Sequence, residues 1–163
     1  MEKIIVAGFG GQGVLSLGQL LTYAAMYENQ YATWLPSYGP EMRGGTANCS
    51  VVIDAVKPVA SPIIAVADTL IAMNKPSLDK FQMNVRKDGL IIINSSLIND
   101  KCANTEARAV YVDANRIAHE NGNNKASNLV ILGAYIKHSG LFPKEVILST
   151  IEKVYANKPQ FIP

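Results

Sequence analysis

The stretch IIVAGFGGQG, residues 4–13, runs an apolar strand pattern into a glycine-rich turn, and an apolar helical pattern begins directly after it. Its glycines fit the spacing G-x-G-x-x-G, in which the backbone turns tightly and approaches a phosphate. The N-terminus of the following helix then directs unpaired N–H groups at that phosphate. The residues of this predicted anion-binding turn are Gly8, Gly10, Gly11, Gln12 and Gly13.

The same glycines also suit a purely structural turn, because glycine lets a helix pack closely on a strand. A dinucleotide site normally has an acidic residue about 20 positions further on, at the end of the second strand, where it holds the ribose hydroxyls. Glu28 has the right separation, but it precedes the next apolar run, which ends without a carboxylate in Leu35-Pro36-Ser37. An ordinary NAD site is therefore less favoured than a phosphate-only site or a structural turn.

The composition predicts one domain, residues 1–163, that contacts other proteins. A chain of 163 residues can bury a sizeable core, and a second domain is not expected. Hydrophobic residues make up 48% of the chain and charged residues 17%, whereas charged residues average about a quarter of a soluble domain. Part of the apolar surface is therefore expected to meet a partner, and self-association of the isolated chain is consistent with the same composition.

Charge and cysteine usage exclude several classes of function. The 15 basic and 13 acidic residues are scattered, so no strong field attracts nucleic acid or a membrane surface. Cys49 and Cys102 are far apart and have no neighbouring ligand at metal-binding spacing, so no metal site is expected. No signal-like leader and no apolar run of about 20 residues is present, which predicts a cytoplasmic protein.

Strand-like and helical patterns alternate along the chain, which predicts an α/β fold: a three-layer, Rossmann-like, mostly parallel sheet with helices on both faces. The expected strands are residues 3–7, 32–35, 47–53, 69–73, 90–94 and 109–112. The expected helices are residues 12–28, 76–87, 113–121, 127–139 and 143–156. The strand over 47–53 follows its predecessor without an intervening helix, so it can run antiparallel to its neighbours.

Local signals support the late helices and suggest minor features. Ser127 or Asn128 can cap the helix over 127–139, and Gly140 offers a left-handed stop. The dipeptide Ser61-Pro62 is typical of a bend that starts a short helix, and Asp68 can cap or orient the segment before the fourth strand.

The segment PSYGPEMRGGT, residues 36–46, lies between the second and third strands and is unusually rich in special residues. The loops that follow parallel strands gather at one edge of the sheet, so this segment and the glycine turn are expected to lie close together. Arg43 can form paired hydrogen bonds to a carboxylate or phosphate, or it can pair with Glu41 and hold the loop. The predicted substrate or subunit-interface residues are Tyr38, Glu41, Arg43, Gly44 and Gly45.

In combination, these motifs resemble the gamma subunit of 2-oxoacid:ferredoxin oxidoreductases. The resemblance rests on GFGGQG at 8–13, PSYGPEMRGG at 36–45, Ser61-Pro62, Ala67-Asp68 and NLVILG at 128–133. It covers almost the whole chain, to about residue 156. The form PEMRGG at 40–45 is most like members that act on 2-oxoglutarate or branched-chain oxoacids. The family's chains commonly continue further, so a short C-terminal segment is expected beyond residue 163.

The resemblance implies a complex that decarboxylates a 2-oxoacid oxidatively, transfers the electrons to ferredoxin and releases acyl-CoA. It implies that alpha, beta and delta subunits hold the thiamine diphosphate, Mg and iron–sulfur clusters, and that coenzyme A is a cosubstrate. This chain would bind none of these cofactors alone, would supply no catalytic residue and would act as a docking and gating component. The isolated chain is therefore expected to be inactive.

Two other functions stay open at this stage. One is a free-standing nucleotide-binding protein or dehydrogenase, in which the glycine turn holds a dinucleotide and Arg43 holds a substrate carboxylate. The missing ribose-binding acid argues against it. The other is a scaffold without a ligand of its own.

Overall fold

Within residues 1–37 and 46–156, which the computed structural model describes, six strands form a single sheet. The strands are β1 (Glu2–Phe9), β2 (Tyr31–Ser37), β3 (Thr46–Asp54), β4 (Ala67–Ala72), β5 (Val85–Asn94) and β6 (Arg108–Val112). The helical elements are α1 (Val14–Tyr27), α2 (Lys75–Phe81), the 3₁₀ turn η1 (Gln82–Asn84), α3 (Ala114–Glu120), α4 (Ser127–Ser139) and α5 (Lys144–Val154). Each of the six expected strands and the five expected longer helices has a counterpart here, with corrections to one helix end and to one short helix given below.

The strand order is β2-β3-β1-β4-β5-β6, with β2 and β6 at the edges. The strands β1, β4, β5 and β6 pair in parallel, whereas β3 is antiparallel to both of its neighbours. The mostly parallel sheet and the antiparallel third strand are therefore confirmed. Because β2 points in the same direction as β1, the ends of these two strands lie at the same edge of the sheet.

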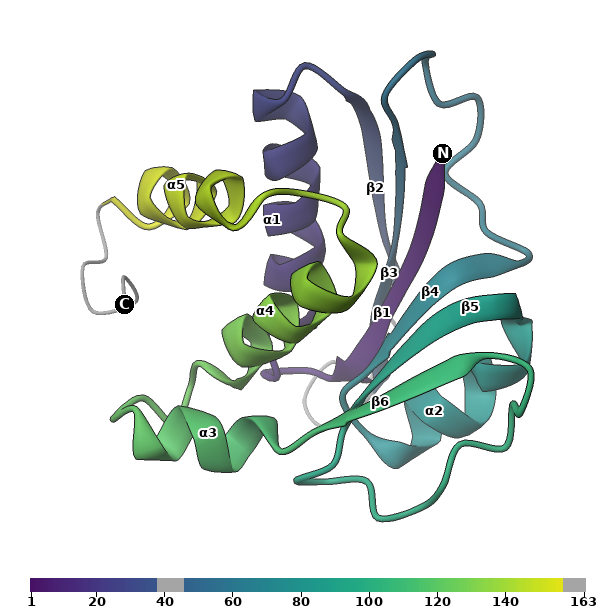
Figure 1. Ribbon diagram of the computed structural model, residues 1–163, viewed down its shortest axis with the longest axis vertical. Helices are drawn as coiled ribbons and strands as arrows, with labels where there is room; N and C mark the ends of the chain where they lie inside the picture. The colour runs from purple at the N-terminus through teal and green to yellow at the C-terminus, as the bar shows by residue number, and fades with distance from the viewer. Residues whose placement is uncertain (38–45, 157–163) are drawn as a thin grey trace.

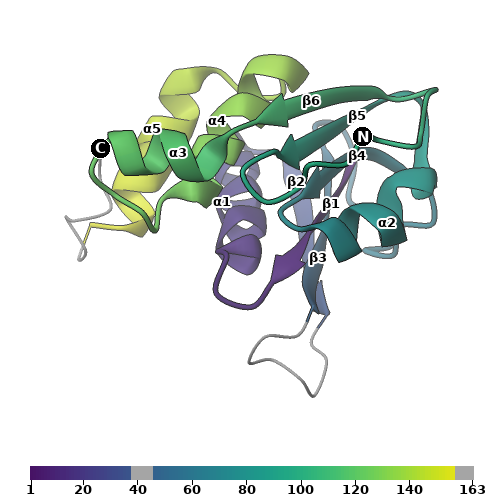
Figure 2. The ribbon, with the colours of Figure 1, turned by 90° about the horizontal axis from the view of Figure 1, so that it is seen from below.

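Helices cover both faces of the sheet unequally. Figures 1 and 2 show α1, α4 and α5 on one face, with α3 beside α4, and α2 on the opposite face. The alternation of side chains along the strands produces this arrangement. In β1, for example, Ile4 and Val6 join the core under α1 and α4, whereas Ile5 and Ala7 join the core that includes Leu78 of α2. The predicted three-layer architecture is thus confirmed.

The helix predicted over residues 76–87 is wrong beyond residue 81. The helix α2 ends at Phe81, η1 follows, and β5 begins at Val85. The sheet overrides helical propensity here, because Val85 pairs with Ala67 of β4. The next residue, Arg86, also holds β5 to β4, since its Nε lies 2.5 Å from Oδ1 of Asp68. Asp68 is therefore a strand residue that fastens β5 to β4, not a cap of the preceding segment.

Two local predictions about helix ends also need correction. The N-cap of α4 is Ala126, without a side-chain cap, and the predicted cap residues Ser127 and Asn128 are the first two residues of the helix. The predicted short helix after Ser61 is absent, because residues 61–64 have no regular secondary structure, and the Ser61 hydroxyl accepts a hydrogen bond from the Ile63 N–H. The left-handed stop at Gly140 is confirmed, with φ of 65°.

Candidate functional site

The glycine turn connects the end of β1 to the start of α1. Gly11 and Gly13 have φ angles of 91° and 72°, which lie in the left-handed region that favours glycine. Gly13 is the N-cap residue of α1, and its carbonyl oxygen accepts the first intrahelical hydrogen bond, from the Leu17 N–H at 2.9 Å. The predicted strand–turn–helix junction is therefore present at the predicted residues.

Two glycines of this turn are required by close packing. A Cβ atom at Gly8 would lie 2.6 Å from Oε1 of Gln12 and 2.8 Å from Cβ of Met73. A Cβ atom at Gly13 would lie 2.4 Å from Nδ2 of Asn128, a residue of α4. By contrast, a Cβ atom at Gly11 would meet no atom within 4 Å. Close packing thus explains why glycine stands at positions 8 and 13, whereas a side chain at position 11 would extend into open space.

The side chain of Gln12 forms hydrogen bonds that hold the glycine turn in place. Its Oε1 accepts a hydrogen bond from the Phe9 N–H at 2.6 Å, and its Nε2 donates to the Met73 carbonyl oxygen at 3.3 Å. The side chain therefore bridges the end of β1 and the residue that follows β4. Both ends of the amide have protein partners, so Gln12 positions the turn, and its predicted contact with a ligand remains a prediction from the sequence.

The first turn of α1 leaves backbone donors available. The N-cap makes no side-chain hydrogen bond, and no acidic residue lies in this turn. The N–H groups of Val14, Leu15 and Ser16 precede the first i→i−4 acceptor position, so the helix itself gives them no partner. These N–H groups and the positive end of the helix dipole together favour an anionic ligand.

A cavity of about 370 Å³ lies between the start of α1, the last residue of β2 and the first residues of β3. It is lined by Phe9, Gly10, Gly11, Gly13, Val14, Leu15, Ser16, Ser37, Thr46 and Ala47. The sheet register explains the grouping, because Phe9 pairs with Thr46, and Ser37 pairs with Asn48. Ser37 and Thr46, the described residues on either side of the segment 38–45, therefore line the same cavity as the glycine turn.

The remaining candidate residues all belong to the segment 38–45. Tyr38, Glu41, Arg43, Gly44 and Gly45 lie outside the described residues. Their assignment to ligand or subunit contacts therefore remains a prediction from the sequence.

The described residues do not offer a metal or cluster site. No group of three or more His, Cys, Asp or Glu side chains lies close enough together among them to hold a metal ion. Cys49 is buried beneath α1, and burial raises the pKa of its thiol to about 12. In the same part of the chain, no helix combines the length and apolar character that a bilayer crossing needs.

Two features were not predicted from the sequence. The first is a hydrogen-bonded cluster after β5 and β6, in which the Ser96 hydroxyl donates to Asp113 and accepts from the Asn115 N–H at 2.9 Å. Hydrogen bonding from Ser96, followed by that from Arg116, holds the pKa of Asp113 below its ordinary value. The Asn-Ser-Ser sequence after an apolar strand was the available signal. Because Ser96 contacts the first turn of α3, the cluster fastens that helix to the sheet.

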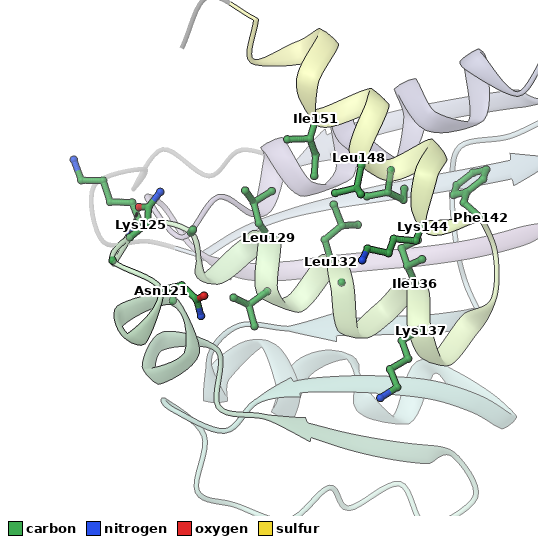
Figure 3. Close-up of a pocket in the computed structure, with 17 residues that line it drawn as sticks. Asn121, Lys125, Leu129, Leu132, Ile136, Lys137, Phe142, Lys144, Leu148 and Ile151 are labelled. Carbon is green, nitrogen blue, oxygen red and sulfur yellow. Dashed lines mark hydrogen bonds between the residues drawn. The ribbon is translucent and has the colours of Figure 1, made fainter. Parts of the chain in front are cut away.

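The second unpredicted feature is an apolar groove between α3, α4 and α5, with a volume of about 1260 Å³. Figure 3 shows Leu129, Leu132 and Ile136 of α4 along the groove, with Leu148 and Ile151 of α5 beside them. Leu132 and Ile136 also belong to the hydrophobic core, and Leu129 packs against it. The same apolar side chains of α4 therefore contribute both to the core and to the lining of the groove.

Comparisons with known proteins agree with this architecture. The family model described as "Pyruvate ferredoxin/flavodoxin oxidoreductase" matches residues 3–163. Ketoisovalerate oxidoreductase subunit VorA of Methanothermobacter marburgensis is 44% identical over 131 residues, which are 80% of this chain and 27% of the relative. The chain thus spans about a quarter of that relative's length.

A second relative is similar to this chain over most of its own length. The 2-oxoglutarate synthase subunit KorC of Methanocaldococcus jannaschii is 31% identical over 159 residues, which are 93% of this chain and 84% of the relative. Among solved structures, the keto/oxoacid ferredoxin oxidoreductase gamma subunit of Geobacter sulfurreducens has a TM-score of 0.80 at 24% identity. That alignment covers 96% of this chain and 90% of the other, and it supports the fold.

Proposed function

This chain belongs to the pyruvate ferredoxin/flavodoxin oxidoreductase family, and we propose that it is the gamma-type component of a multi-subunit 2-oxoacid:ferredoxin oxidoreductase. The assembled enzyme would convert a 2-oxoacid and coenzyme A into acyl-CoA and CO2, with the electrons passed to ferredoxin. The names of the two relatives, a ketoisovalerate oxidoreductase and a 2-oxoglutarate synthase, favour a branched-chain 2-oxoacid or 2-oxoglutarate as the substrate.

The residues of this chain do not fit the redox cofactors of such a complex. An iron–sulfur cluster needs several cysteine thiolates, whereas Cys49 is buried with a raised pKa and Cys102 lies on the loop between β5 and β6. The Mg ion of thiamine diphosphate needs oxygen ligands, and no suitable group of side chains is present among the described residues. The proposal therefore assigns thiamine diphosphate, Mg and the clusters to partner subunits, and no step of the reaction to this chain.

The cavity at the glycine turn is the observation that carries the proposed role. It combines the unpaired N–H groups at the start of α1 with both flanks of the segment 38–45. A phosphate of coenzyme A suits the N–H groups, because helix N-termini bind anions through backbone donors and the helix dipole. Arg43 in the adjoining segment would supply the matching side-chain charge. This chain would then position coenzyme A while the other subunits supply the reactive groups.

The first test compares the isolated chain with the complex co-expressed from its partner genes. Reduction of a viologen dye is measured with ketoisovalerate, 2-oxoglutarate and pyruvate, each with coenzyme A. We expect no turnover by the isolated chain, and the highest kcat/KM of the complex with ketoisovalerate or 2-oxoglutarate. Turnover by the isolated chain, or failure to co-purify with any other subunit, would refute the proposal.

A charge placed in the first turn of α1 tests the phosphate site. Ser16→Glu favours the helix dipole and should leave the fold intact, but its carboxylate would repel a phosphate at the helix N-terminus. We expect the KM for coenzyme A to rise about tenfold or more in the complex, because repulsion between like charges costs more than 1.4 kcal/mol in a partly enclosed site. Gln19→Glu, one turn later on the same helix, is the matched control. Equal KM values for the two variants would contradict the site.

Arg43→Ala tests the adjoining segment in the same complex. We expect a higher KM for coenzyme A or for the 2-oxoacid, because a cation that pairs with an anionic group is removed. Arg108→Ala, on the edge strand β6, is the control for the loss of an arginine. The role assigned to the segment fails if assembly and both KM values remain unchanged.

A further inference from the structure

A second cavity, between α3, α4 and α5, shares no lining residue with the cavity at the glycine turn. Its volume of about 1260 Å³ exceeds the roughly 300–1,000 Å³ that is typical of a pocket for a small ligand. Figure 3 shows that the groove follows the length of α4. A helix of 13 residues is about 20 Å long, so the groove can accommodate three to four turns of another helix.

Apolar side chains from two helices form the walls and floor of this groove. The helix α4 contributes Leu129, Leu132 and Ile136, and α5 contributes Ile147, Leu148 and Ile151. Leu148 is 38% exposed, which is unusual for a leucine beside such a large apolar surface. Apolar surface that borders a concave groove is typical of protein interaction sites.

One residue leaves the middle of the groove open. Gly133 lies on α4 four residues after Leu129 and four before Lys137, so the three share one side of the helix. A Cβ atom at Gly133 would meet no atom within 4 Å. Glycine lowers helix stability, so a glycine inside α4 at which a Cβ atom would meet no described residue needs another reason. Close approach of a second helix is such a reason.

The charges around the groove have one sign. Lys125, Lys137 and Lys144 line it, and no aspartate or glutamate is among the described residues that do so. The ion pairs found in the described part of the chain involve none of these three lysines. An occupant with carboxylates beside an apolar stripe would match both the lysines and the apolar walls.

We propose that the groove between α3, α4 and α5 binds an amphipathic α-helix of a partner polypeptide, with an apolar stripe flanked by aspartate or glutamate. This mode of recognition places an apolar helix face into a groove through anchors at i, i+3, i+4 and i+7. The concave shape favours a helix over a membrane surface, which would need a flat or convex apolar face. The inference rests on the proposed function, because we expect the partner helix to belong to another subunit of the same enzyme complex.

Site-specific photo-crosslinking in the assembled complex tests the proposal. A benzoylphenylalanine in place of Leu148, which lines the groove and is 38% exposed, places the reactive group at the groove without filling its middle, and mass spectrometry identifies the peptide that it captures. We expect a peptide of another subunit, with apolar residues at helical spacing and at least two flanking carboxylates. Crosslinks only within the chain, only to a second copy, only to lipid or to no molecule would overturn the proposal.

Variants of Gly133 measure the contribution of the groove. Gly133→Phe places a large side chain in the open middle of the groove and should weaken assembly about tenfold or more, and Gly133→Ala, which adds only a Cβ atom, should weaken it less. Neither should lower the melting temperature of the isolated chain, because both side chains favour a helix more than glycine does. Equal dissociation constants for wild type and Gly133→Phe would overturn the proposal.

The lysines are tested by charge reversal. A triple variant with Lys125→Glu, Lys137→Glu and Lys144→Glu should weaken assembly about tenfold or more, and the dissociation constant of the wild type should rise with salt. Lys101→Glu, on an exposed loop, is the control. If the complex assembles and turns over substrate while both groove variants behave as wild type, only this inference fails. If the chain joins no complex at all, the proposed function fails as well.

Discussion

The side-chain amide nitrogen of Asn128 donates a hydrogen bond to the carbonyl oxygen of Gly13, which lies 3.4 Å away and 115 positions earlier in the chain. The contact joins the first turn of α4 to the N-cap of α1. Asn128 is 8% exposed, and its side chain occupies the space that a Cβ atom at position 13 would need. The glycine turn thus depends on a helix from the opposite end of the sequence.

Gly13→Ala is expected to destabilise the protein for two separable reasons. The alanine would adopt a left-handed backbone conformation, which costs about 1–3 kcal/mol, and its Cβ would collide with Asn128. Urea unfolding of the single and double variants measures both effects. Adding Asn128→Ala removes the side chain that collides with the alanine at position 13 but leaves the strained backbone. The double variant should therefore lose less free energy of unfolding than the two single variants lose together.

The control for this cycle is Gly133→Ala, in the exposed middle of α4. It should raise the free energy of unfolding by up to about 1 kcal/mol, because alanine is a better helix former and its Cβ meets no atom. Equal effects of alanine at positions 13 and 133 would contradict the packing argument.

Gln12→Ala should lower the free energy of unfolding by about 1 kcal/mol, because two hydrogen bonds that hold the glycine turn are lost. Since both ends of the amide hold the turn in place, the variant should raise the KM for coenzyme A less than Ser16→Glu does. Chemical denaturation and steady-state kinetics of the complex measure the two effects. A larger change in KM for Gln12→Ala, with unchanged stability, would show that Gln12 binds the ligand directly.

Alkylation should distinguish the two cysteines. Burial raises the pKa of Cys49 to about 12, so almost none of this thiol is ionised at pH 8. Its sulfur is also shielded by α1, because a Cβ atom added at Gly18 would lie only 2.5 Å from Sγ of Cys49. Iodoacetamide at pH 8 should therefore modify Cys102 in the folded protein and both cysteines in urea. Mass spectrometry of Cys102→Ser, which should remain unmodified when folded, is the control. Rapid alkylation of Cys49 in that folded variant would refute the prediction.

The pH dependence of stability should reflect Glu2. Burial raises the pKa of its carboxyl above the ordinary 4.5, although the Thr69 hydroxyl donates a hydrogen bond to it at 2.9 Å. The folded chain therefore binds this proton more tightly than the unfolded chain does, so the group favours folding at low pH. That contribution disappears as the pH rises from 4.5 through the raised folded pKa.

Glu2→Gln removes this titration and keeps an oxygen that can accept from Thr69. Its stability relative to wild type should be near zero at pH 4 and should become positive by pH 7, as measured by urea unfolding at several pH values. The exposed Glu106→Gln is the control. A difference that does not change with pH, or that changes in the opposite direction, would argue against the role of burial.

The sequence predicted the fold well because its strongest signals are local and periodic. The glycine turn after β1 and the left-handed stop at Gly140 could be located from residue types alone. The antiparallel course of β3 followed from the absence of a helix between it and β2. The prediction failed at residues 82–87, where strand pairing with β4 outweighs helical propensity, and such pairing is not visible in a local window.

The site was predictable only in part, for the same reason. The sequence indicated that the glycine turn and the segment 38–45 share one edge of the sheet, and the register of Phe9 with Thr46 agrees. It could not indicate that Gln12 and Asn128 fill the space around the turn, because Met73 and Gly13, which they contact, are distant in the chain. The groove beside α4 was missed because its residues match an ordinary core pattern.

The reversed direction of β3 has a consequence for how such proteins can diversify. Because β2 and β3 form a hairpin, the eight residues between Ser37 and Thr46 connect two stems whose register is set elsewhere, by pairing with each other and with β1. A wholly parallel sheet would need a crossover helix at this point, and the connection would be tied to a whole layer of the fold. Here the insert can be exchanged between homologues, or changed in length, without shifting a strand. A change in this one connection could thus alter what this edge of the sheet binds while the pairing of the six strands stays the same.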